Sequence, residues 1–342
     1  MVPRRRRAAV MSDVGRLAGV SHQTVSRVIN ASPNVRSETR DRVLAAMREL
    51  DYRPNSVARA LVTGRSRTLG VVSFDTTLYG PASTLVGIER AAHEAGYFII
   101  VASLKALTRE SVTEAVERLR LHGVEGILVI APYDDAVQAL VEVSAEVPLV
   151  AVESGPARGI PVACVDQAQG AREATRHLLE LGHRTVWHIG GPANFLEARE
   201  RAAGWRETLV QAGAPVHEPL LGDWSPRAGY ELGGRLSCDP AVSAVFVAND
   251  QMALGLLRAL QEAGRSVPGD VSVVGFDDVP EAAYFTPPLT TVRQDFDEMG
   301  RRGVGLLLEG IAGGAGVGAS AVKAELVVRS STEAPRVRNQ KH

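Results

Sequence analysis

One short segment near the N-terminus, residues 22–30, carries side chains able to hydrogen-bond to nucleic-acid bases and phosphates. Its apolar residues Val25, Val28 and Ile29 recur at helical spacing and share one face of a predicted helix. On the opposite face, glutamine suits paired hydrogen bonds to adenine and arginine suits guanine. Such a face is a plain solvated surface in most helices. The outward residues are His22, Gln23, Ser26 and Arg27, and Thr24, Ser26 and Asn30 are short donors suited to phosphates.

A second group of polar and aromatic residues lies far along the chain, near apolar runs typical of strands. Asn249 and Asp277 each follow such a run, Arg199 lies in a polar stretch, and Trp224 supplies an aromatic face. Sugar sites combine planar hydrogen-bonding groups with a ring for stacking, so this group is a candidate sugar site. Ordinary alternatives exist, because Arg199 suits a surface ion pair, Asn249 and Asp277 suit helix caps, and Trp224 suits the core.

The nucleic-acid candidates belong to a predicted unit of three short helices, at about 12–18, 22–30 and 37–50. Gly19 can end the first helix and Ser21 can cap the second, which makes a tight helix-turn-helix. The apolar residues predicted to share one core are Met11, Val14, Leu17, Ala18, Val20, Val25, Val28, Ile29, Val43, Leu44, Met47 and Leu50.

The charge of the chain is strongly uneven, although its net charge is only -1. Residues 1–67 hold 14 basic and 5 acidic side chains, a net charge of +9, whereas the remainder holds 24 basic and 34 acidic ones, a net charge of −10. A basic head of this size is the electrostatic footprint of a polyanion partner. Together with the tight turn, it favours DNA as the ligand of the head.

Nine residues, Arg53–Leu61, connect the basic head to the acidic body. Pro54 pushes the preceding residue out of the helical region, and Asn55 or Ser56 can cap a helix of barely two turns. A helix that short is unstable alone in water, so these residues by themselves favour a linker.

From residue 69 onward, short apolar runs alternate with amphipathic segments, which is the pattern of repeated βα units. This pattern predicts parallel sheets covered by helices, with ligands beyond the carboxyl ends of the strands. So many strands suit two sheets better than one. The predicted strands include about 69–72, 98–101, 127–130, 149–152, 186–189, 244–247 and 271–274.

The composition argues against several functional classes. Cys164 and Cys238 lie far apart and are predicted to be buried small hydrophobes in a reducing compartment. The eight histidines show no metal-ligand spacing, so neither a metal nor another cofactor is expected. No apolar segment follows Arg4–Arg7, and no membrane span is recognisable, so a cytoplasmic protein is expected.

The head contains the motifs Asp13-Val14, Leu17-Ala18-Gly19-Val20-Ser21, Thr24-Val25-Ser26-Arg27-Val28-Ile29-Asn30 and Tyr52-Arg53-Pro54-Asn55. The body contains Gly222-Asp223-Trp224-Ser225 and three longer motifs at 247–255, 272–278 and 287–296. Together they resemble the LacI/GalR (lactose-repressor) family of transcription regulators, over about residues 10–331. The resemblance implies a two-lobed body of the periplasmic-binding-protein type. Its lobes would comprise about 67–165 with 296–323, and 166–295 with 324–333.

The resemblance also implies that the head binds double-stranded operator DNA. It places His22, Gln23 and Arg27 at base-reading positions of a recognition helix, with Asn34 as a further contact in the following loop. The segment 53–61 then becomes a hinge helix that enters the minor groove, where a leucine is wedged between base steps. The implied hinge contacts are Asn55, Arg59 and Leu61.

Two residues of the head depart from the family pattern. Val10 replaces the threonine that usually caps the first helix, and Gly15 replaces an alanine inside it, at about 1 kcal/mol of helix propensity. Ser12 is expected to take over the cap.

In the body, the resemblance implies a sugar site between the lobes that includes Arg199, Trp224, Asn249 and Asp277. Of these, Trp224, Asn249 and Asp277 favour a galactoside-like effector. Differences from the family pattern leave the exact sugar open, since Glu153 stands in place of a shorter aspartate and Val165 in place of an aromatic residue. The other implied contacts are Leu78, Gly80, Pro81, Gln294 and Phe296.

The predicted organisation is a basic extension (1–9), a helix-turn-helix domain (10–52), a hinge and linker (53–66), an effector-binding and dimerisation domain (67–333) and a disordered tail (334–342). Because the tail lacks leucine heptads, a homodimer is expected. The predicted function is a DNA-binding transcriptional repressor whose operator binding is relieved by a small sugar.

Three alternatives stay open at this point. In a co-repressor, the sugar strengthens DNA binding. A stand-alone sugar-binding protein would use the same body, but the basic head and the lack of a signal peptide argue against it. A glycosidase would use Glu153 and Asp277 as paired carboxylates, which requires a defined separation across the scissile bond. An enzyme is not expected.

Overall fold

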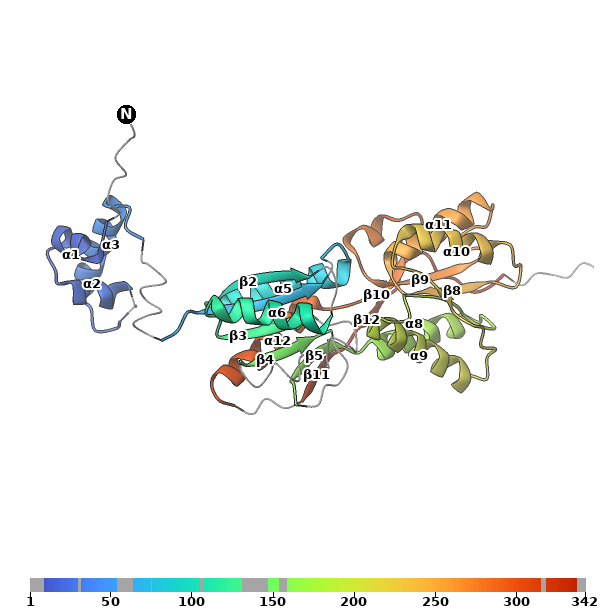
Figure 1. Cartoon of the computed structure of the whole chain (residues 1–342). Helices are drawn as coiled ribbons and strands as arrows, with labels where there is room; N and C mark the ends of the chain where they lie inside the picture. Colours follow the sequence, from blue (N-terminus) through green and yellow to red (C-terminus); the bar gives the residue numbers. More distant parts are fainter. Residues whose placement is uncertain are drawn as a thin grey trace, which may run out of the picture. The chain divides into compact units, whose positions relative to one another are not determined.

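The computed structural model describes residues 9–29, 32–53, 64–74, 76–104, 108–130, 147–153, 159–314 and 318–336. The chain folds as two compact units, Met1–Ser66 and Arg67–His342, which are called the head and the body below (Figure 1). Within the described ranges, no helix combines the length and the apolar character that crossing a bilayer requires.

In its described residues, the head is a bundle of three short helices, and a tight turn joins the first two. Gly19 ends the first helix in the left-handed conformation, with a φ of 67°. Ser21 caps the second helix, because its Oγ accepts a hydrogen bond from the Thr24 N–H at 3.2 Å. These two caps confirm the predicted helix-turn-helix. The helices are α1 (Met11–Ala18), α2 (His22–Ile29) and α3 (Ser37–Glu49).

Two expectations for the head are wrong. Ser12 does not cap α1, because that helix begins one residue earlier and Asp13 Oδ2 accepts from the Val10 N–H at 3.1 Å. Leu17 and Leu44 do not enter the core, since their side chains are 46% and 41% exposed. Three short helices cover only a narrow stripe of one another, and both leucines lie outside it. The buried core consists of Val14, Ala18, Val25, Val28, Val43 and Ala46.

The packing around Gly15 explains why a glycine stands inside α1. A Cβ added there would lie 2.8 Å from the carbonyl oxygen of Val20, and the Val20 N–H donates to the Gly15 carbonyl at 2.9 Å. The turn between α1 and α2 therefore packs directly on this position. The space that the turn needs offsets the low helix propensity of glycine.

The body consists of two six-stranded sheets with flanking helices (Figure 1). The first has the strand order β11-β5-β4-β3-β1-β2 and is wholly parallel. The second has the order β12-β10-β9-β8-β6-β7 and is parallel except for β12, which runs antiparallel to β10. The predicted class, two mainly parallel sheets covered by helices, is confirmed.

The strands of the first sheet fall within 67–165 and 296–323, and those of the second within 166–295 and 324–333. The two groups are called the first lobe and the second lobe below. The strands are β1 (Thr68–Phe74), β2 (Phe98–Leu104), β3 (Gly126–Ile130), β4 (Leu149–Val152), β5 (Val162–Val165), β6 (Trp187–Gly190), β7 (Leu220–Leu221), β8 (Ala244–Val247), β9 (Ser272–Asp277), β10 (Thr290–Arg293), β11 (Ala319–Val322) and β12 (Glu325–Val327). The helices of the body are α5 (Tyr79–Glu94), α6 (Arg109–Leu121), α8 (Gln167–Glu180), α9 (Leu196–Gln211), α10 (Pro226–Ser237), α11 (Asp250–Glu262), the 3₁₀ helix η1 (Pro280–Tyr284) and α12 (Phe296–Ile311).

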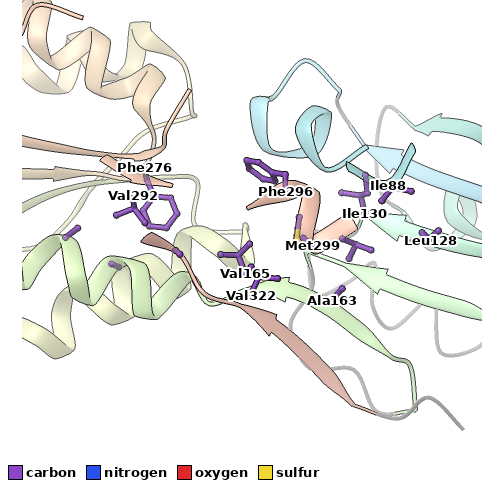
Figure 2. Packing of buried hydrophobic residues seen from close by; sticks show 14 of the residues in the cluster. Ile88, Leu128, Ile130, Ala163, Val165, Phe276, Val292, Phe296, Met299 and Val322 are labelled. Carbon is purple, nitrogen blue, oxygen red and sulfur yellow. The ribbon is translucent and has the colours of Figure 1, made fainter. Parts of the chain in front are cut away.

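A single cluster of buried apolar residues extends through both lobes (Figure 2). Phe276 and Val292 belong to it in the second lobe, and Phe296 begins the helix that carries it into the first. Val165 and Val322, which are register partners on β5 and β11, lie where the chain passes between the sheets. The lobes are therefore joined by buried packing as well as by the connecting backbone.

Helices α5 and α12 approach so closely that both carry glycine at the contact. A Cβ added at Gly300 would overlap the backbone of Gly87, and a Cβ added at Gly87 would overlap the carbonyl of Phe296. The same contact positions two aromatic residues at the helix starts, because the rings of Tyr79 and Phe296 meet edge to face at 5.8 Å between centroids.

We predict that Gly300→Ala destabilises the body by about 1–3 kcal/mol, because the added methyl group forces α5 and α12 apart. Gly305→Ala is the matched control on α12, since nothing lies within 4 Å of its added Cβ. The free energy of unfolding of Gly305→Ala should rise by up to about 1 kcal/mol, because alanine has the higher helix propensity. Urea denaturation of both variants measures the two effects, and equal stability of the pair would contradict the packing account.

Candidate functional site

The outer face of α2 presents the polar side chains that the sequence marks for DNA. His22, Gln23 and Arg27 are exposed, as is Asn34 in the following loop. Thr24 is half-buried, and its hydroxyl lies 3.0 Å from the Ser21 hydroxyl at the helix start. The described residues thus form one polar surface over the helix-turn-helix. Ser26 is also half-buried, whereas Asn30, Asn55, Arg59 and Leu61 lie outside the described residues.

A cavity of about 260 Å³ lies in the body and is lined by residues of both lobes. Most of its polar wall comes from positions at or just after the carboxyl ends of parallel strands, where the βα pattern predicts ligands. Glu153 follows β4, Asn249 follows β8, Asp277 ends β9, and Gln294 follows β10. Nine of the predicted contacts line it: Leu78, Gly80, Pro81, Glu153, Trp224, Asn249, Asp277, Gln294 and Phe296.

A buried arginine forms the centre of the polar wall. Arg201 is only 3% exposed and donates from Nε to Gln167 Oε1 at 2.8 Å and from Nη1 to the Ala248 carbonyl at 2.5 Å. Its Nη2 lies 3.7 Å from Asp277 Oδ1, which also accepts from Gln294 Nε2 at 2.6 Å. The paired charge and these hydrogen bonds make this burial tolerable.

Aromatic rings form the apolar wall. Trp224 and Phe195 meet edge to face, with 5.5 Å between ring centroids, and the Arg201 guanidinium lies 5.6 Å from the Trp224 ring. A Cβ at Gly191 would overlap the indole, so glycine is required behind it. A flat ring beside fixed donors and acceptors is the arrangement that a sugar requires.

Asn249 supports this wall rather than only facing the cavity. Its Oδ1 accepts from the Met252 N–H at 2.9 Å, so it caps α11. Its Nδ2 donates to the Trp224 carbonyl at 3.1 Å and to Gln251 Oε1 at 3.0 Å. Asn249 is therefore both a helix cap, as the alternative interpretation expected, and a residue of the cavity wall. Asp277, by contrast, ends a strand and caps no described helix.

Three cavity residues adopt left-handed backbone conformations that L-residues rarely occupy. The φ angles are 59° for Glu153, 73° for Trp224 and 108° for Asp277. Such conformations each cost about 1–3 kcal/mol and persist where the surroundings hold them in place. Their concentration here marks the cavity as the functional part of the body.

Burial shifts the titration of the cavity carboxyl groups. It raises the pKa of Asp277 to about 6, although the Arg201 guanidinium and the Gln294 hydrogen bond act in the opposite direction. It raises the pKa of Glu197 to about 7, again against the effect of Arg201. Burial and the neighbouring Glu197 carboxylate raise the pKa of Glu153 well above its usual range, against a hydrogen bond from Thr84.

Two predicted site residues lie elsewhere. Arg199 is exposed on α9, and Arg201 occupies the cavity wall in its place. The two are two positions apart along the helix, so they point to different sides of it. Val165 does not line the main cavity, because it packs beside Val322 in the core between the lobes. It borders a small side cavity of about 10 Å³ that Glu153 also lines.

The prediction missed half of the residues that line the cavity, including two on α9. A signal for Arg201 existed, since it lies three residues after Ala198 and four before Trp205, both buried on one stripe of α9. An arginine in phase with a buried stripe is a candidate for an internal charge. The residues missed are Thr77, Tyr79, Phe195, Glu197, Arg201, Asp223, Ser225, Pro226 and Gln251.

The described residues also show how possible metal ligands are arranged and where the two cysteines lie. Within them, no group of three His, Cys, Asp or Glu side chains is arranged to bind a metal ion. Cys164 is half-buried, and burial raises the pKa of its thiol to about 11. Cys238 is exposed, so the prediction that both cysteines are buried is wrong for it. It follows α10 at the surface, and its thiol donates to the Gly234 carbonyl at 3.4 Å.

Comparison with known proteins matches both parts of the chain. Residues 10–55 match the family described as bacterial regulatory proteins, lacI family, and residues 175–332 match the periplasmic binding protein-like domain. The lactose operon repressor of Escherichia coli (strain K12) is 36% identical over 325 residues, which cover 94% of this chain and 90% of that protein.

Two solved structures resemble the whole fold. The crystal structure of the lac repressor dimer bound to operator and the anti-inducer ONPF has a TM-score of 0.85 at 35% identity, covering 96% of this chain and 100% of that chain. The complex of the transcriptional regulator CelR with cellobiose has a TM-score of 0.69 at 34% identity, covering 94% of this chain and 99% of that one.

We predict that Arg201→Met destabilises the body by about 3–5 kcal/mol, because Asp277 loses the opposite charge that makes its burial tolerable. The matched control is Arg199→Met on the same helix. The Arg199 side chain is exposed, so its replacement should change the free energy of unfolding by about 1 kcal/mol or less. Urea denaturation compares the two variants. A larger loss for Arg199→Met would overturn the assignment of the internal charge.

A second prediction concerns pH. The folded-state pKa of Glu197 lies near 7 against an ordinary value of 4.5, so folding favours its protonated form. That stabilisation is fully present below the ordinary value and is lost as the pH rises through the folded value. The parent should therefore lose stability relative to Glu197→Gln between about pH 5 and pH 8. Melting temperatures measured across this range test it, with exposed Glu207→Gln as the surface control on α9.

Proposed function

Because the chain belongs to the lacI family of bacterial regulatory proteins, we propose that it represses transcription until a small sugar lowers its affinity for operator DNA. Family membership makes the chain a DNA-binding transcription regulator rather than an enzyme. The glycosidase alternative therefore falls, and the carboxyl groups of the cavity are binding groups.

The observation that carries the proposal is a cavity walled by both lobes on a chain that also has a helix-turn-helix. Leu78 and Glu153 come from the first lobe, whereas Asn249 and Asp277 come from the second. A sugar that touches both walls binds one lobe arrangement more tightly than another and so shifts the population toward it. This difference in affinity is the coupling free energy available to change DNA binding, typically about 1–3 kcal/mol.

On the DNA side, the exposed His22, Gln23 and Arg27 of α2 support base reading in the major groove. The hinge predicted at 53–61 lies outside the described residues, and its role comes from the sequence resemblance. A helix too short to be stable alone can be ordered by the minor groove and released when the lobes rearrange. In this proposal, the hinge is the element whose order the sugar changes.

The assembly we propose is a homodimer on a nearly palindromic operator, because a symmetric pair of heads requires symmetric half-sites. A relative of the same fold has been solved as a dimer bound to operator. A regulator that acts on bacterial operators works in the cytoplasm, which is the location proposed for this chain.

For the effector, we propose a hexose disaccharide. One relative is named for the lactose operon, and another has been solved with cellobiose. Lactose and cellobiose share a β-linked pair of hexose rings and differ in one hydroxyl orientation. The galactoside-like effector favoured by the sequence is one member of this class, and the co-repressor alternative differs only in the sign of the response.

We predict that cellobiose or lactose weakens operator binding by the full-length protein about 5–150-fold, the range of ordinary allosteric coupling. The operator is first selected from a random duplex library, and fluorescence anisotropy then measures DNA affinity with and without sugar. Tighter DNA binding in sugar would identify a co-repressor instead. Absence of any selected sequence would overturn the regulator itself.

Two variants test the response to sugar and the recognition of DNA separately. Trp224→Ala removes the aromatic wall, so it should bind operator normally and lose the response to sugar. Arg27→Ala removes an exposed base-reading candidate, so it should bind sugar normally and discriminate less between operators. A normal sugar response in Trp224→Ala would show that the effector binds outside this cavity.

A further inference from the structure

The cavity contains an excess of acidic groups. Among the described residues that line it, four carry carboxyl groups and only Arg201 is basic. Asp277 is paired with that arginine at 3.7 Å and receives the Gln294 hydrogen bond. Asp223 is exposed and accepts from the N–H and hydroxyl of Ser225 at 2.9 and 2.5 Å. The excess therefore lies with the other two carboxyl groups.

Those two groups are Glu153 and Glu197, which line the main cavity from opposite lobes and together border the small side cavity. Neither forms an ion pair with a basic side chain in the described part of the chain. Arg201 does not form an ion pair with either of them, because its Nε and Nη1 donate to Gln167 and Ala248 and its Nη2 is directed at Asp277. Within the described residues, Arg201 lowers the pKa of both carboxyl groups, but neither has an ion-pair partner of its own.

One acceptor of this pair also lacks a hydrogen bond. Glu153 is only 6% exposed, and its Oε1 accepts from the Thr84 hydroxyl. Its Oε2 is fully buried and has no hydrogen-bond partner within the described ranges, and the same is true of Trp224 Nε1. A buried polar atom without a partner is unfavourable, so a ligand that donates to Glu153 gains a hydrogen bond that the protein alone lacks.

We propose that the cavity is built for an amino sugar, a hexosamine or a β-linked hexosamine disaccharide, whose ammonium group lies against Glu153 and Glu197. This inference rests on the sugar-responsive function proposed above. A sugar hydroxyl can satisfy one orphan acceptor but supplies no charge. An ammonium group carries three donors and one positive charge, so it can satisfy Glu153 Oε2 and supply a counter-charge to the two carboxyl groups.

Binding an ammonium group here is coupled to proton release. Burial and the neighbouring Glu197 raise the pKa of Glu153 well above its usual range, so folding favours its protonated form. A bound cation favours the ionised form and drives that proton into solvent. The charged or titratable groups facing Glu153 are Cys164 on β5, Glu197, Glu200 and Arg201 on α9, and Asp277 at the end of β9.

The test compares matched sugars by isothermal titration calorimetry of the full-length protein. The pairs are glucose with glucosamine, galactose with galactosamine, and cellobiose with the β-1,4-linked glucosamine disaccharide, and N-acetylglucosamine serves as the uncharged amide. Each titration is run in two buffers of different ionisation enthalpy, which reports the protons released. We expect at least one amino sugar to bind about tenfold more tightly than its neutral partner, with net proton release.

Glu153→Gln is the informative variant, because its Oε1 can still accept from Thr84 while the charge is removed. It should lose the preference for the amino sugar and the proton release, whereas Glu207→Gln, an exposed carboxyl on the same helix as Glu197, should keep both. If Glu153→Gln fails to fold, the ratio of affinities between each amino sugar and its neutral partner, measured on the parent, decides the question.

The outcomes separate this inference from the function on which it rests. Neutral disaccharides that bind and alter operator affinity, with amino sugars no tighter, would overturn the amino-sugar inference and leave the repressor proposal standing. Failure of both sugar classes to bind would overturn both. Tight binding of amino sugars without proton release would also contradict the placement of the ammonium group beside Glu153.

Discussion

The cavity depends on one buried ionic group, the Arg201 guanidinium. An ionised side chain can stay in an apolar interior only if it is paired and fully hydrogen-bonded. Its partners come from three elements: Gln167 at the start of α8, the Ala248 carbonyl after β8, and Asp277 at the end of β9. The Phe276 ring covers one face of the guanidinium, with its centroid 3.9 Å from Cζ. The charge thereby fixes the relative positions of the strand ends that form the polar wall.

The same network reaches the connection between the lobes. Gln294 donates to Asp277 and accepts from Gln167 at 2.8 Å, and it lies two residues before Phe296. Phe296 begins α12, contacts Tyr79 at the start of α5, and belongs to the core that spans both lobes (Figure 2). A ligand that engages the polar wall thus acts on a continuous set of packed residues leading into the first lobe, and through that set it can favour one lobe arrangement.

Stability is lowered locally where the ligand is expected. Left-handed residues, a carboxylate oxygen without a partner and an indole N–H without a partner occur together around one cavity of the described body. Each feature is unfavourable for the protein alone, and each becomes favourable when a complementary donor, acceptor or charge is supplied.

Local sequence patterns were sufficient for the helix-turn-helix, the two sheets, and the residues at strand ends such as Asn249 and Asp277, because periodicity, caps and the order of βα units act over a few residues. They did not lead to Arg201 in place of Arg199, although Arg201 lies in phase with Ala198 and Trp205, because the packing of α9 on the body decides which side of that helix is buried. They also did not show that Val165 turns into the core between the lobes or that Leu17 stays exposed. Burial and pairing of charge depend on residues distant in sequence, so tertiary structure alone decided which polar groups meet in the cavity.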